Sequence, residues 1–235
     1  MTTVEPGRVA PGRVLVTGGA SGLGAAVAQA VAKAGGEPVA LDLTEPGYPV
    51  EFVAADLADG RAAEAAVRTV AERHGGLDAV VCAAGIDRCG ALAEVPAGEW
   101  ERVVAVNLLG TAAVVRAALP FLEHGHGRVV TVASTLGLRA LPDASAYCAS
   151  KFGVVGLTRA LAAETAGRVG VTLLVPGGMR TRFFDDRPER YRPPADASLN
   201  QPEDVAATVL FALSQPAGCE LRELVVCPST EPSWP

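Results

Sequence analysis

The first segment with a regular pattern is Val14-Leu15-Val16-Thr17-Gly18-Gly19-Ala20-Ser21-Gly22-Leu23-Gly24, followed by Ala25-Ala26-Val27-Ala28. A short apolar strand breaks into glycines at positions 18, 22 and 24 and resumes as an alanine-rich helix, so the backbone turns sharply there or meets a ligand closely. Free N–H groups at the positive end of a new helix favour an anion. We interpret this stretch as a pyrophosphate-binding turn. The alternative is a tight turn whose glycines serve packing alone.

An acidic residue follows at the distance expected for a dinucleotide site. The spacing Gly-x3-Gly-x-Gly differs from the commoner Gly-x-Gly-x2-Gly fingerprint, but a second apolar strand, 38–41, ends at Asp42, eighteen residues beyond Gly24. A carboxylate there reaches the adenosine ribose hydroxyls and repels a 2′-phosphate, and the next residue, Leu43, provides no cation. This favours NAD over NADP as cofactor. The alternative is an acid that simply ends a strand.

The bulk composition narrows the class of protein. A chain of 235 residues with 49% apolar residues suits one α/β domain with a large core. The net charge of −6 provides no electrostatic footprint for nucleic acid. The first residues, 1–6, lack the basic and apolar regions of a signal peptide, and no uncharged apolar run approaches eighteen residues. We therefore expect a soluble cytoplasmic protein without a nucleic-acid or membrane partner.

Cysteine and histidine usage gives no metal signal. The residues concerned are Cys82, Cys89, Cys148, Cys219, Cys227, His74, His124 and His126. The cysteines are odd in number and form no C-x-x-C pair, so neither a disulfide framework nor a zinc site is supported. The histidines all stand beside glycines, where we expect solvated loop residues. We predict no metal site.

Strand and helix patterns alternate along the whole chain. Expected helices cover 22–34, 60–74, 97–122, 145–166 and 202–214, and expected strands cover 14–17, 38–42, 50–54, 77–83, 127–133, 171–175 and 221–227. Continuous apolar strands between helices indicate a parallel sheet covered on both faces. We predict a Rossmann-type, doubly wound α/β fold of about seven strands, with residues 1–12 as a flexible leader and 13–235 as a single domain. Its ligand should lie over the carboxyl ends of the strands.

Several small or polar residues should line that crevice. The glycine turn 18–24, Asp42, Asp56 and Ala83-Ala84-Gly85 all follow strands. Small side chains at 83–85 allow a flat cofactor to lie against the backbone. The alternative is that they merely turn the chain.

Four residues in the second half suggest proton chemistry. Tyr147 and Lys151 lie four residues apart on one helix face, and we expect the ammonium group to lower the pKa of the phenol, which then acts as an acid or base. Ser134, at the end of the fifth expected strand, is placed to donate a hydrogen bond to a developing oxyanion. Asn107 interrupts an apolar helix and needs buried partners, so a purely structural role is its alternative. Tyr-x3-Lys pairs are also common on helix surfaces.

Together these residues resemble the short-chain dehydrogenase/reductase family, from about Val14 to Thr181. Thr17-Gly18-x3-Gly22-x-Gly24 is similar to its cofactor motif. The residues Asn107, Ser134, Tyr147 and Lys151 match its four catalytic positions in order and spacing. Pro176-Gly177-x3-Thr181 resembles the family segment that contacts the nicotinamide end of the cofactor.

The resemblance implies a role for each matched residue. Tyr147 is implied as the acid–base, Lys151 as its activator and a ribose ligand, and Ser134 as the residue that orients substrate. Asn107 is implied to support a water relay. The cofactor-binding residues expected on all these grounds are Thr17, Gly18, Ser21, Gly22, Leu23, Gly24, Asp42, Asp56, Leu57, Ala83, Ala84, Gly85, Tyr147, Lys151, Pro176, Gly177 and Thr181.

One segment departs from the family pattern. Where the family usually has Asn-Asn-Ala-Gly, this chain has Cys82-Ala83-Ala84-Gly85, and no obvious residue replaces the lost asparagine hydrogen bonds. We therefore expect reduced local rigidity there. The resemblance also implies a homodimer or homotetramer that packs through helices 97–122 and 145–166.

The region after Thr181 is expected to shape the substrate site. The segment of about 178–200 is irregular and holds five arginines between positions 180 and 192. These arginines suit an acidic or acyl-carrier substrate, or a solvated surface with internal ion pairs. An apolar pocket is expected from Ile86, Leu136, Leu138, Met179 and Phe183. Trp234 is expected to dock on its own fold or on a neighbouring subunit.

The sequence thus predicts an NAD(P)-dependent oxidoreductase acting on an apolar secondary alcohol or ketone. One alternative is a catalytically silent nucleotide sensor on the same fold, although such a sensor has no need of a tuned phenol. A second alternative, an epimerase or lyase, ordinarily needs a larger substrate domain than the tail after Thr181 provides.

Overall fold

A seven-stranded parallel sheet forms the centre of the molecule, and the computed structural model describes residues 9–234. The strand order is β3-β2-β1-β4-β5-β6-β7. The strands are β1 (Arg13–Thr17), β2 (Glu37–Asp42), β3 (Glu51–Ala54), β4 (Ala79–Cys82), β5 (Arg128–Val132), β6 (Gly170–Pro176) and β7 (Glu223–Val226). The predicted doubly wound α/β fold is confirmed.

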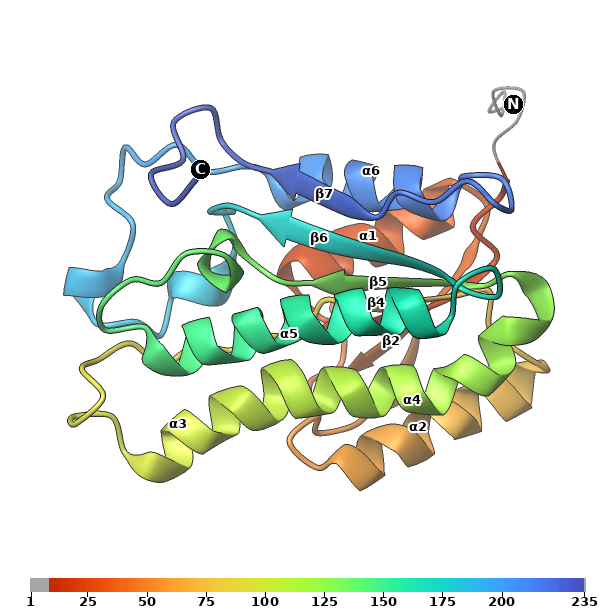
Figure 1. Ribbon diagram of the computed structural model, residues 1–235, viewed down its shortest axis with the longest axis horizontal. Coiled ribbons are helices and arrows are strands. Elements are labelled where there is room, and N and C mark those ends of the chain that lie inside the picture. Colours follow the sequence, from red (N-terminus) through yellow and green to blue (C-terminus); the bar gives the residue numbers. More distant parts are fainter. Residues whose placement is uncertain (1–8, 235) are drawn as a thin grey trace.

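Helices cover both faces of this sheet (Figure 1). They are α1 (Gly22–Lys33), α2 (Gly60–His74), α3 (Ala97–Val104), α4 (Thr111–Leu122), α5 (Ser145–Glu164) and α6 (Pro202–Leu213). Helices α1 and α6 pack together on one face, while α2, α4 and α5 lie on the other. The predicted strands and helices occur with ends that differ by at most a few residues, except that the predicted helix 97–122 is divided into α3, a π-helical turn and α4.

Burial on both faces explains why the central strands are continuous apolar runs. Every residue of β4 is buried, and Leu15 of β1 and Leu174 of β6 are fully shielded from solvent. Parallel strands need crossover connections, whose helices then cover the two faces. The valine-rich strands therefore build two core layers, one on each side of the sheet.

The predicted helix 97–122 is interrupted by a π-helical turn, Ala105–Gly110. Asn107 lies in this turn with its side chain buried in hydrogen bonds to neighbouring segments. Such single wide turns inside helices are often found at functional sites. The stretch 97–122 is long and apolar enough to cross a membrane by length and composition, but 56% of its most apolar window is buried in the molecule. The helices of this stretch pack against α2 and α5, as expected for a helix in the core of the molecule.

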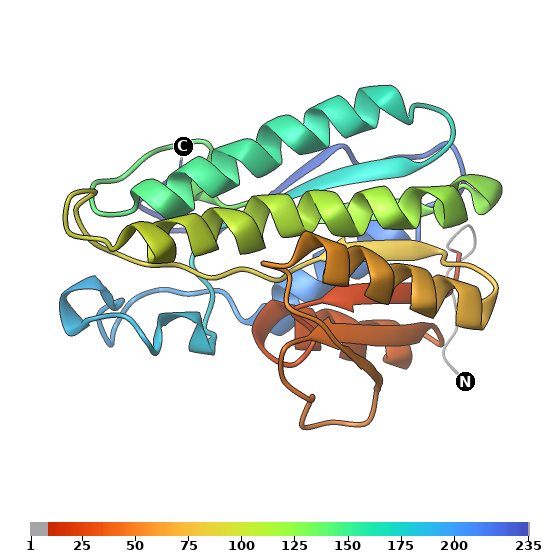
Figure 2. The same ribbon diagram turned by 90° about the horizontal axis from the view of Figure 1, so that it is seen from below.

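The crevice predicted at the carboxyl ends of the strands arises from the strand order. Strands β1 and β4 are hydrogen-bonded neighbours, yet the chain leaves β1 toward β2 and leaves β4 toward β5, in opposite directions along the sheet. A crevice opens at such a switch point. Figure 2 shows segment 178–200 at the same end of the molecule as the loop that follows β4.

The chain ends and one histidine depart from expectation. The leader predicted at 1–12 falls mostly on residues 1–8, which lie outside the described residues, while the backbone N–H of Val9 donates to the Ser214 carbonyl. Trp234 keeps 39% of its surface exposed, so its ring is not fully buried on its own fold, and docking on a neighbouring subunit stays a prediction. His74 ends α2 and contacts Glu51 instead of standing free in a loop.

No group of three metal-ligating side chains occurs among the described residues.

Replacing Leu174 by alanine tests the role of the central strands. Leu174→Ala leaves a cavity in a fully buried position, which costs about 2–5 kcal/mol in the free energy of unfolding. Leu92→Ala is the matched control because Leu92 is 66% exposed, and its change should stay within about 0.5 kcal/mol. Urea denaturation measures both; equal losses would contradict the assigned core.

Candidate active site

The glycine turn between β1 and α1 is packed too closely for side chains. Gly18 has a φ of +70°, and a Cβ at this position would lie 2.8 Å from the Ala84 backbone. A Cβ at Gly24 would overlap the Gly18 carbonyl oxygen. The Gly18 N–H donates to the Leu41 carbonyl at 2.9 Å, which ties the turn to β2. Packing therefore requires glycine at both positions, and the interpretation of this turn as a pyrophosphate site stays a prediction.

The first turn of α1 is left open toward the cleft. The N-cap residue Ser21 makes no side-chain capping bond, and the first turn has no acidic side chain. The first N–H groups of a helix have no partner within the helix, and the helix dipole adds positive potential there. Ser21 and Gly22 line the cleft, so this helix end suits a phosphate group.

Asp42 is held beside the glycine turn. Its carboxylate accepts hydrogen bonds from the Ala20 N–H at 3.0 Å and from the Thr44 N–H at 3.2 Å. Tyr48, which the sequence analysis did not single out, donates its hydroxyl to the Gly19 carbonyl at 2.6 Å. Burial, with Asp42 nearby, raises the pKa of Tyr48 to about 12, so this donor stays protonated. The carboxylate has a fixed place at the cleft end of β2.

The segment Cys82–Gly85 is anchored despite its missing asparagines. The Thr17 hydroxyl accepts from the Ala84 N–H at 3.2 Å. The Asn107 side chain binds both backbone groups of Ile86, the residue that follows this segment. Its Oδ1 accepts from the Ile86 N–H at 2.8 Å, and its Nδ2 donates to the Ile86 carbonyl at 2.9 Å. The backbone is therefore held at Ala84 and Ile86, while the expected effect of the missing asparagines on local rigidity stays a prediction.

Asn107 acts behind the wall of the cleft. Its side chain is 1% exposed, and its amide also donates to the Ser150 hydroxyl at 3.0 Å. Neither Asn107 nor Thr17 lines the cleft. Asn107 therefore joins the segment after β4 to α5, and these contacts are the ones expected of a residue with a structural role.

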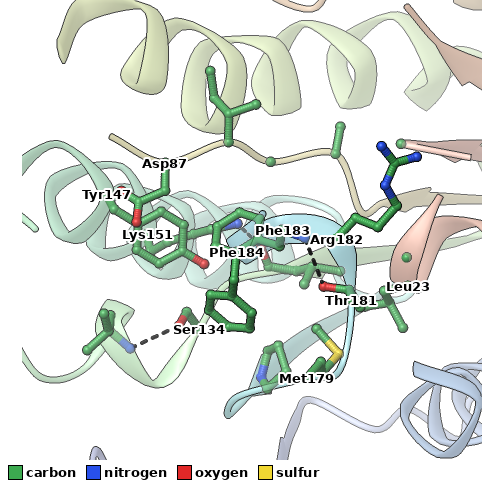
Figure 3. Close-up of a pocket in the computed structure, with 18 of the residues that line it drawn as sticks. Leu23, Asp87, Ser134, Tyr147, Lys151, Met179, Thr181, Arg182, Phe183 and Phe184 are labelled. Atoms are coloured by element: carbon green, nitrogen blue, oxygen red, sulfur yellow. Dashed lines mark hydrogen bonds between the residues drawn. The ribbon is translucent and has the colours of Figure 1, made fainter. Parts of the chain in front are cut away.

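Tyr147, Lys151 and Ser134 come together at the other end of the same cleft (Figure 3). Lys151 donates from Nζ to the Val132 carbonyl at 2.8 Å, and its Nζ lies 5.6 Å from the Tyr147 ring centroid. Tyr147 and Ser134 share a side-chain hydrogen bond. The Ser134 hydroxyl also accepts from the Leu136 N–H at 3.1 Å, which leaves its own hydrogen to donate toward the Tyr147 oxygen. The predicted group therefore assembles as expected.

The pKa of the phenol differs from expectation. Burial raises the pKa of Tyr147 to about 12, and the hydrogen bond with Ser134 opposes this only in part. Burial also lowers the pKa of Lys151 to about 8, because an ammonium group is costly to hold away from water. The predicted lowering of the Tyr147 pKa by Lys151 is wrong for the protein alone. The phenol is a protonated donor at neutral pH.

The substrate segment covers this end of the cleft. The Phe183 ring lies 5.7 Å from the Tyr147 ring, and the Arg187 guanidinium stacks on Phe183 and Phe184. Arg187 pairs with Asp87 at 2.6 Å, and the side chain of Asp87 is only 3% exposed. Of the five arginines, Arg182 has the expected internal partner in the exposed pair with Asp185. Arg187 differs, because its partner lies in the loop after β4.

One cleft of about 740 Å³ therefore unites the two halves of the predicted site. Its lining includes Gly18, Ser21, Gly22, Leu23, Gly24, Asp42, Asp56, Leu57, Ala83, Ala84, Gly85, Ser134, Tyr147, Lys151, Pro176, Gly177 and Thr181. This volume lies within the range of cofactor and ligand clefts. Asp87, Arg187 and Glu231 also line the cleft. The sequence places Arg187 among the five arginines of the substrate segment, but no motif identified Asp87 or Glu231, because only the fold brings their loops to the site.

Comparison with known proteins agrees with this geometry. A family model described as short chain dehydrogenase matches residues 12–192. The chain belongs to the short chain dehydrogenase family. The expected family resemblance is thereby confirmed, and it covers the glycine turn and the Tyr147 group alike.

Individual relatives match most of this chain but differ in their own length. The chain is 36% identical to 2-dehydro-3-deoxy-L-rhamnonate dehydrogenase (NAD(+)) of a Sphingomonas species, over 91% of this chain and 92% of that protein. It is 33% identical to glycine betaine reductase ATRR of Emericella nidulans, of whose length it spans only 19%. An alcohol dehydrogenase structure from Thermococcus sibiricus, complexed with 5-hydroxy-NADP, matches with a TM-score of 0.83 at 25% identity, covering 94% of this chain and 97% of that one.

The pH dependence of unfolding tests the burial of Lys151. The unfolded lysine has a pKa near 10.4, so between about pH 8 and 10 the unfolded chain binds more protons than the folded chain. The contribution of Lys151 to stability should therefore rise with pH in that window, at most by about 1.4 kcal/mol per pH unit. Lys151→Met removes this contribution.

Urea titrations of wild type and Lys151→Met at several pH values provide the measurement. The difference between their free energies of unfolding should shift in favour of the wild type from pH 8 to 10. A pH-independent difference would contradict the assigned burial of the ammonium group.

Proposed function

We propose that this protein is an NAD-dependent oxidoreductase that moves hydride between a nicotinamide cofactor and the carbinol carbon of a secondary alcohol or ketone. The observation that carries this proposal is the meeting of Tyr147, Ser134 and Lys151 in one cleft with the glycine turn. Family membership supports the oxidoreductase class. When bound, the nicotinamide supplies or accepts the hydride.

The cleft has a suitable environment for each part of a dinucleotide. The open N-terminus of α1 suits the pyrophosphate, and Asp42 suits the adenosine ribose hydroxyls. Thr181 lies 3.5 Å from the Cβ that Gly22 lacks, so the loop after β6 borders the glycine turn. The nicotinamide end then lies between that loop and Tyr147. Figure 3 shows Thr181 and Leu23 on one side of the cleft and Tyr147 on the other.

Tyr147 handles the proton in this proposal. As a protonated phenol it donates its hydrogen to a substrate carbonyl oxygen that gains negative charge, and in the reverse direction its phenolate form accepts the alcohol proton. Ser134 donates a second hydrogen bond to the same oxygen. Lys151, held by the Val132 carbonyl, stabilises the phenolate through its positive charge.

The preference for NAD rests on Asp42. Its carboxylate is fixed by the Ala20 N–H at the end of β2, where a 2′-phosphate would bring like charges together. The Sphingomonas relative carries NAD(+) in its name, whereas the Thermococcus structure contains an NADP derivative, so both cofactors occur among similar proteins. The local charge at position 42 favours NAD.

An uncharged substrate with apolar groups fits the remaining wall. Phe183, Leu136 and Met179 line the cleft, and the Phe183 ring lies 5.7 Å from the Tyr147 ring. Arg187 is neutralised by Asp87, so this pair presents no net charge to an acidic substrate. We therefore retain a secondary alcohol or ketone over an acyl-carrier substrate. A silent nucleotide sensor is less well supported, because three polar groups are buried together beside the cleft with the donors that proton transfer needs.

A homodimer or homotetramer remains part of the proposal. Leu109 and Phe152 are 60% and 45% exposed, and both lie in the helix layer formed by the π-helical turn, α4 and α5. Burying such side chains against a second copy provides apolar stabilisation. We also retain the proposed cytoplasmic location.

Replacing Tyr147 by phenylalanine tests the proton donor. Tyr147→Phe keeps the ring against Phe183 and removes only the hydroxyl, so NADH binding should stay within about twofold while turnover falls about 10²–10⁴-fold. Fluorescence titration and a coupled screen of ketones and secondary alcohols measure the two effects. Unchanged turnover would reject Tyr147 as the acid.

Replacing Asp42 by asparagine tests the cofactor preference. Asp42→Asn keeps the carbonyl acceptor for the Ala20 N–H and removes the charge that repels a 2′-phosphate. The ratio of NAD to NADP affinities should narrow by about tenfold or more. A wild-type enzyme that prefers NADP would overturn the role given to this carboxylate.

A further inference from the structure

The last residues of the chain return to the cleft. After β7 ends at Val226, the segment 228–234 folds back so that Glu231, Pro232 and Ser233 line the same cleft as Tyr147. Ser233 is buried, and its hydroxyl lies 2.7 Å from the hydroxyl of Thr135, the residue that follows Ser134 in the chain. This C-terminal strap, residues 228–234, is thus part of the cleft wall next to the proton-handling group.

The carboxylate of Glu231 is fixed on the loop that follows β6. It accepts from the Gly178 N–H at 2.8 Å, from the Ser233 N–H at 3.2 Å and from the Ser233 hydroxyl at 2.6 Å. A Cβ at Gly177 would overlap the carboxylate oxygen, so glycine at this position leaves the space that Glu231 occupies. Three hydrogen-bond donors, together with the space left by the missing side chain of Gly177, therefore fix the position of the Glu231 carboxylate.

This carboxylate keeps its negative charge without a cationic partner. Among the ion pairs of the described residues, none involves Glu231. Burial raises the pKa of its carboxyl, but the hydrogen bonds from Ser233 and Gly178 outweigh burial and hold the pKa below its usual range. Glu231 is thus ionised at neutral pH and is balanced only by dipoles.

The two redox forms of the cofactor differ in charge at one end. The nicotinamide ring is a cation when oxidised and is neutral after it accepts hydride. A fixed anion near this ring stabilises the oxidised form more than the reduced form, while the adenosine and pyrophosphate parts are the same in both.

We propose that Glu231 is an electrostatic selector for the oxidised cofactor, with its carboxylate on the Gly177–Gly178 backbone favouring the cationic nicotinamide over the neutral one. This inference rests on the proposed function, because the nicotinamide end must lie beside the loop after β6. It gives the C-terminal strap a role in setting the direction of the reaction: tighter binding of NAD⁺ relative to NADH makes the bound cofactor a stronger hydride donor and favours carbonyl reduction on the protein.

Equilibrium binding of the two redox forms tests this selector. Isothermal titration calorimetry with NAD⁺ and, separately, NADH gives two dissociation constants for each protein. Glu231→Gln keeps an oxygen for the Gly178 N–H but removes the charge, so the dissociation constant for NAD⁺ should rise about tenfold while that for NADH changes less than about twofold. Glu231→Asp keeps the charge and should restore most of the preference.

Two further variants separate charge from positioning. Glu72→Gln removes one negative charge on α2, outside the cleft lining, and should leave both constants unchanged. Pro232→Lys places an ammonium group beside an intact Glu231 at an exposed lining position, and should weaken NAD⁺ selectively. It also provides the test should circular dichroism show that Glu231→Gln is unfolded.

The outcomes are distinct. Selective loss of NAD⁺ affinity in Glu231→Gln, or in Pro232→Lys, supports the selector. Equal weakening of both redox forms assigns Glu231 a positioning role only and overturns the inference, as does no change. A wild-type protein that binds neither NAD⁺ nor NADH overturns the proposed function, and this inference with it.

Discussion

The pairing of β1 with β4 is the constraint on which the site depends. These strands exchange backbone hydrogen bonds in parallel register from Val14 opposite Ala79 to Thr17 opposite Cys82. The pairing brings the glycine turn after β1 against the small residues after β4, where the Gly18 backbone and Ala84 have no room for another side chain. The cleft follows because the chain then winds away in two directions. Without this register, Asp42 and Tyr147 would have no common cavity.

Polar groups buried behind the cleft fix its wall. Asn107 occupies the π-helical turn and satisfies both backbone groups of Ile86, while its remaining donor reaches Ser150 on α5. Lys151 reaches the Val132 carbonyl from the same helix. These bonds join the π-helical turn and α5 to each other and to the segments at the ends of β4 and β5. Buried polar groups without such partners would cost several kcal/mol, so the site and the fold stabilise each other.

The elements with strong local signals were predictable from the sequence. Apolar runs bounded by glycine gave β1, β4 and α1, and the four-residue spacing placed Tyr147 and Lys151 on one helix face. What failed depends on long-range packing. The pKa of Tyr147 is set by burial under Phe183 and its surroundings, which a spacing of four residues does not reveal. Likewise, Thr17 accepts from the Ala84 N–H, 67 positions along the chain, and Glu231 accepts from the Gly178 N–H, 53 positions away.

A crystal structure of the protein with bound NAD⁺ is the measurement that tests the central claim most directly. The account predicts the adenosine ribose on Asp42, the pyrophosphate at the first N–H groups of α1, and the nicotinamide beside the Tyr147 hydroxyl and the loop after β6. A cofactor bound outside this cleft, or one whose nicotinamide points away from Tyr147, would contradict it.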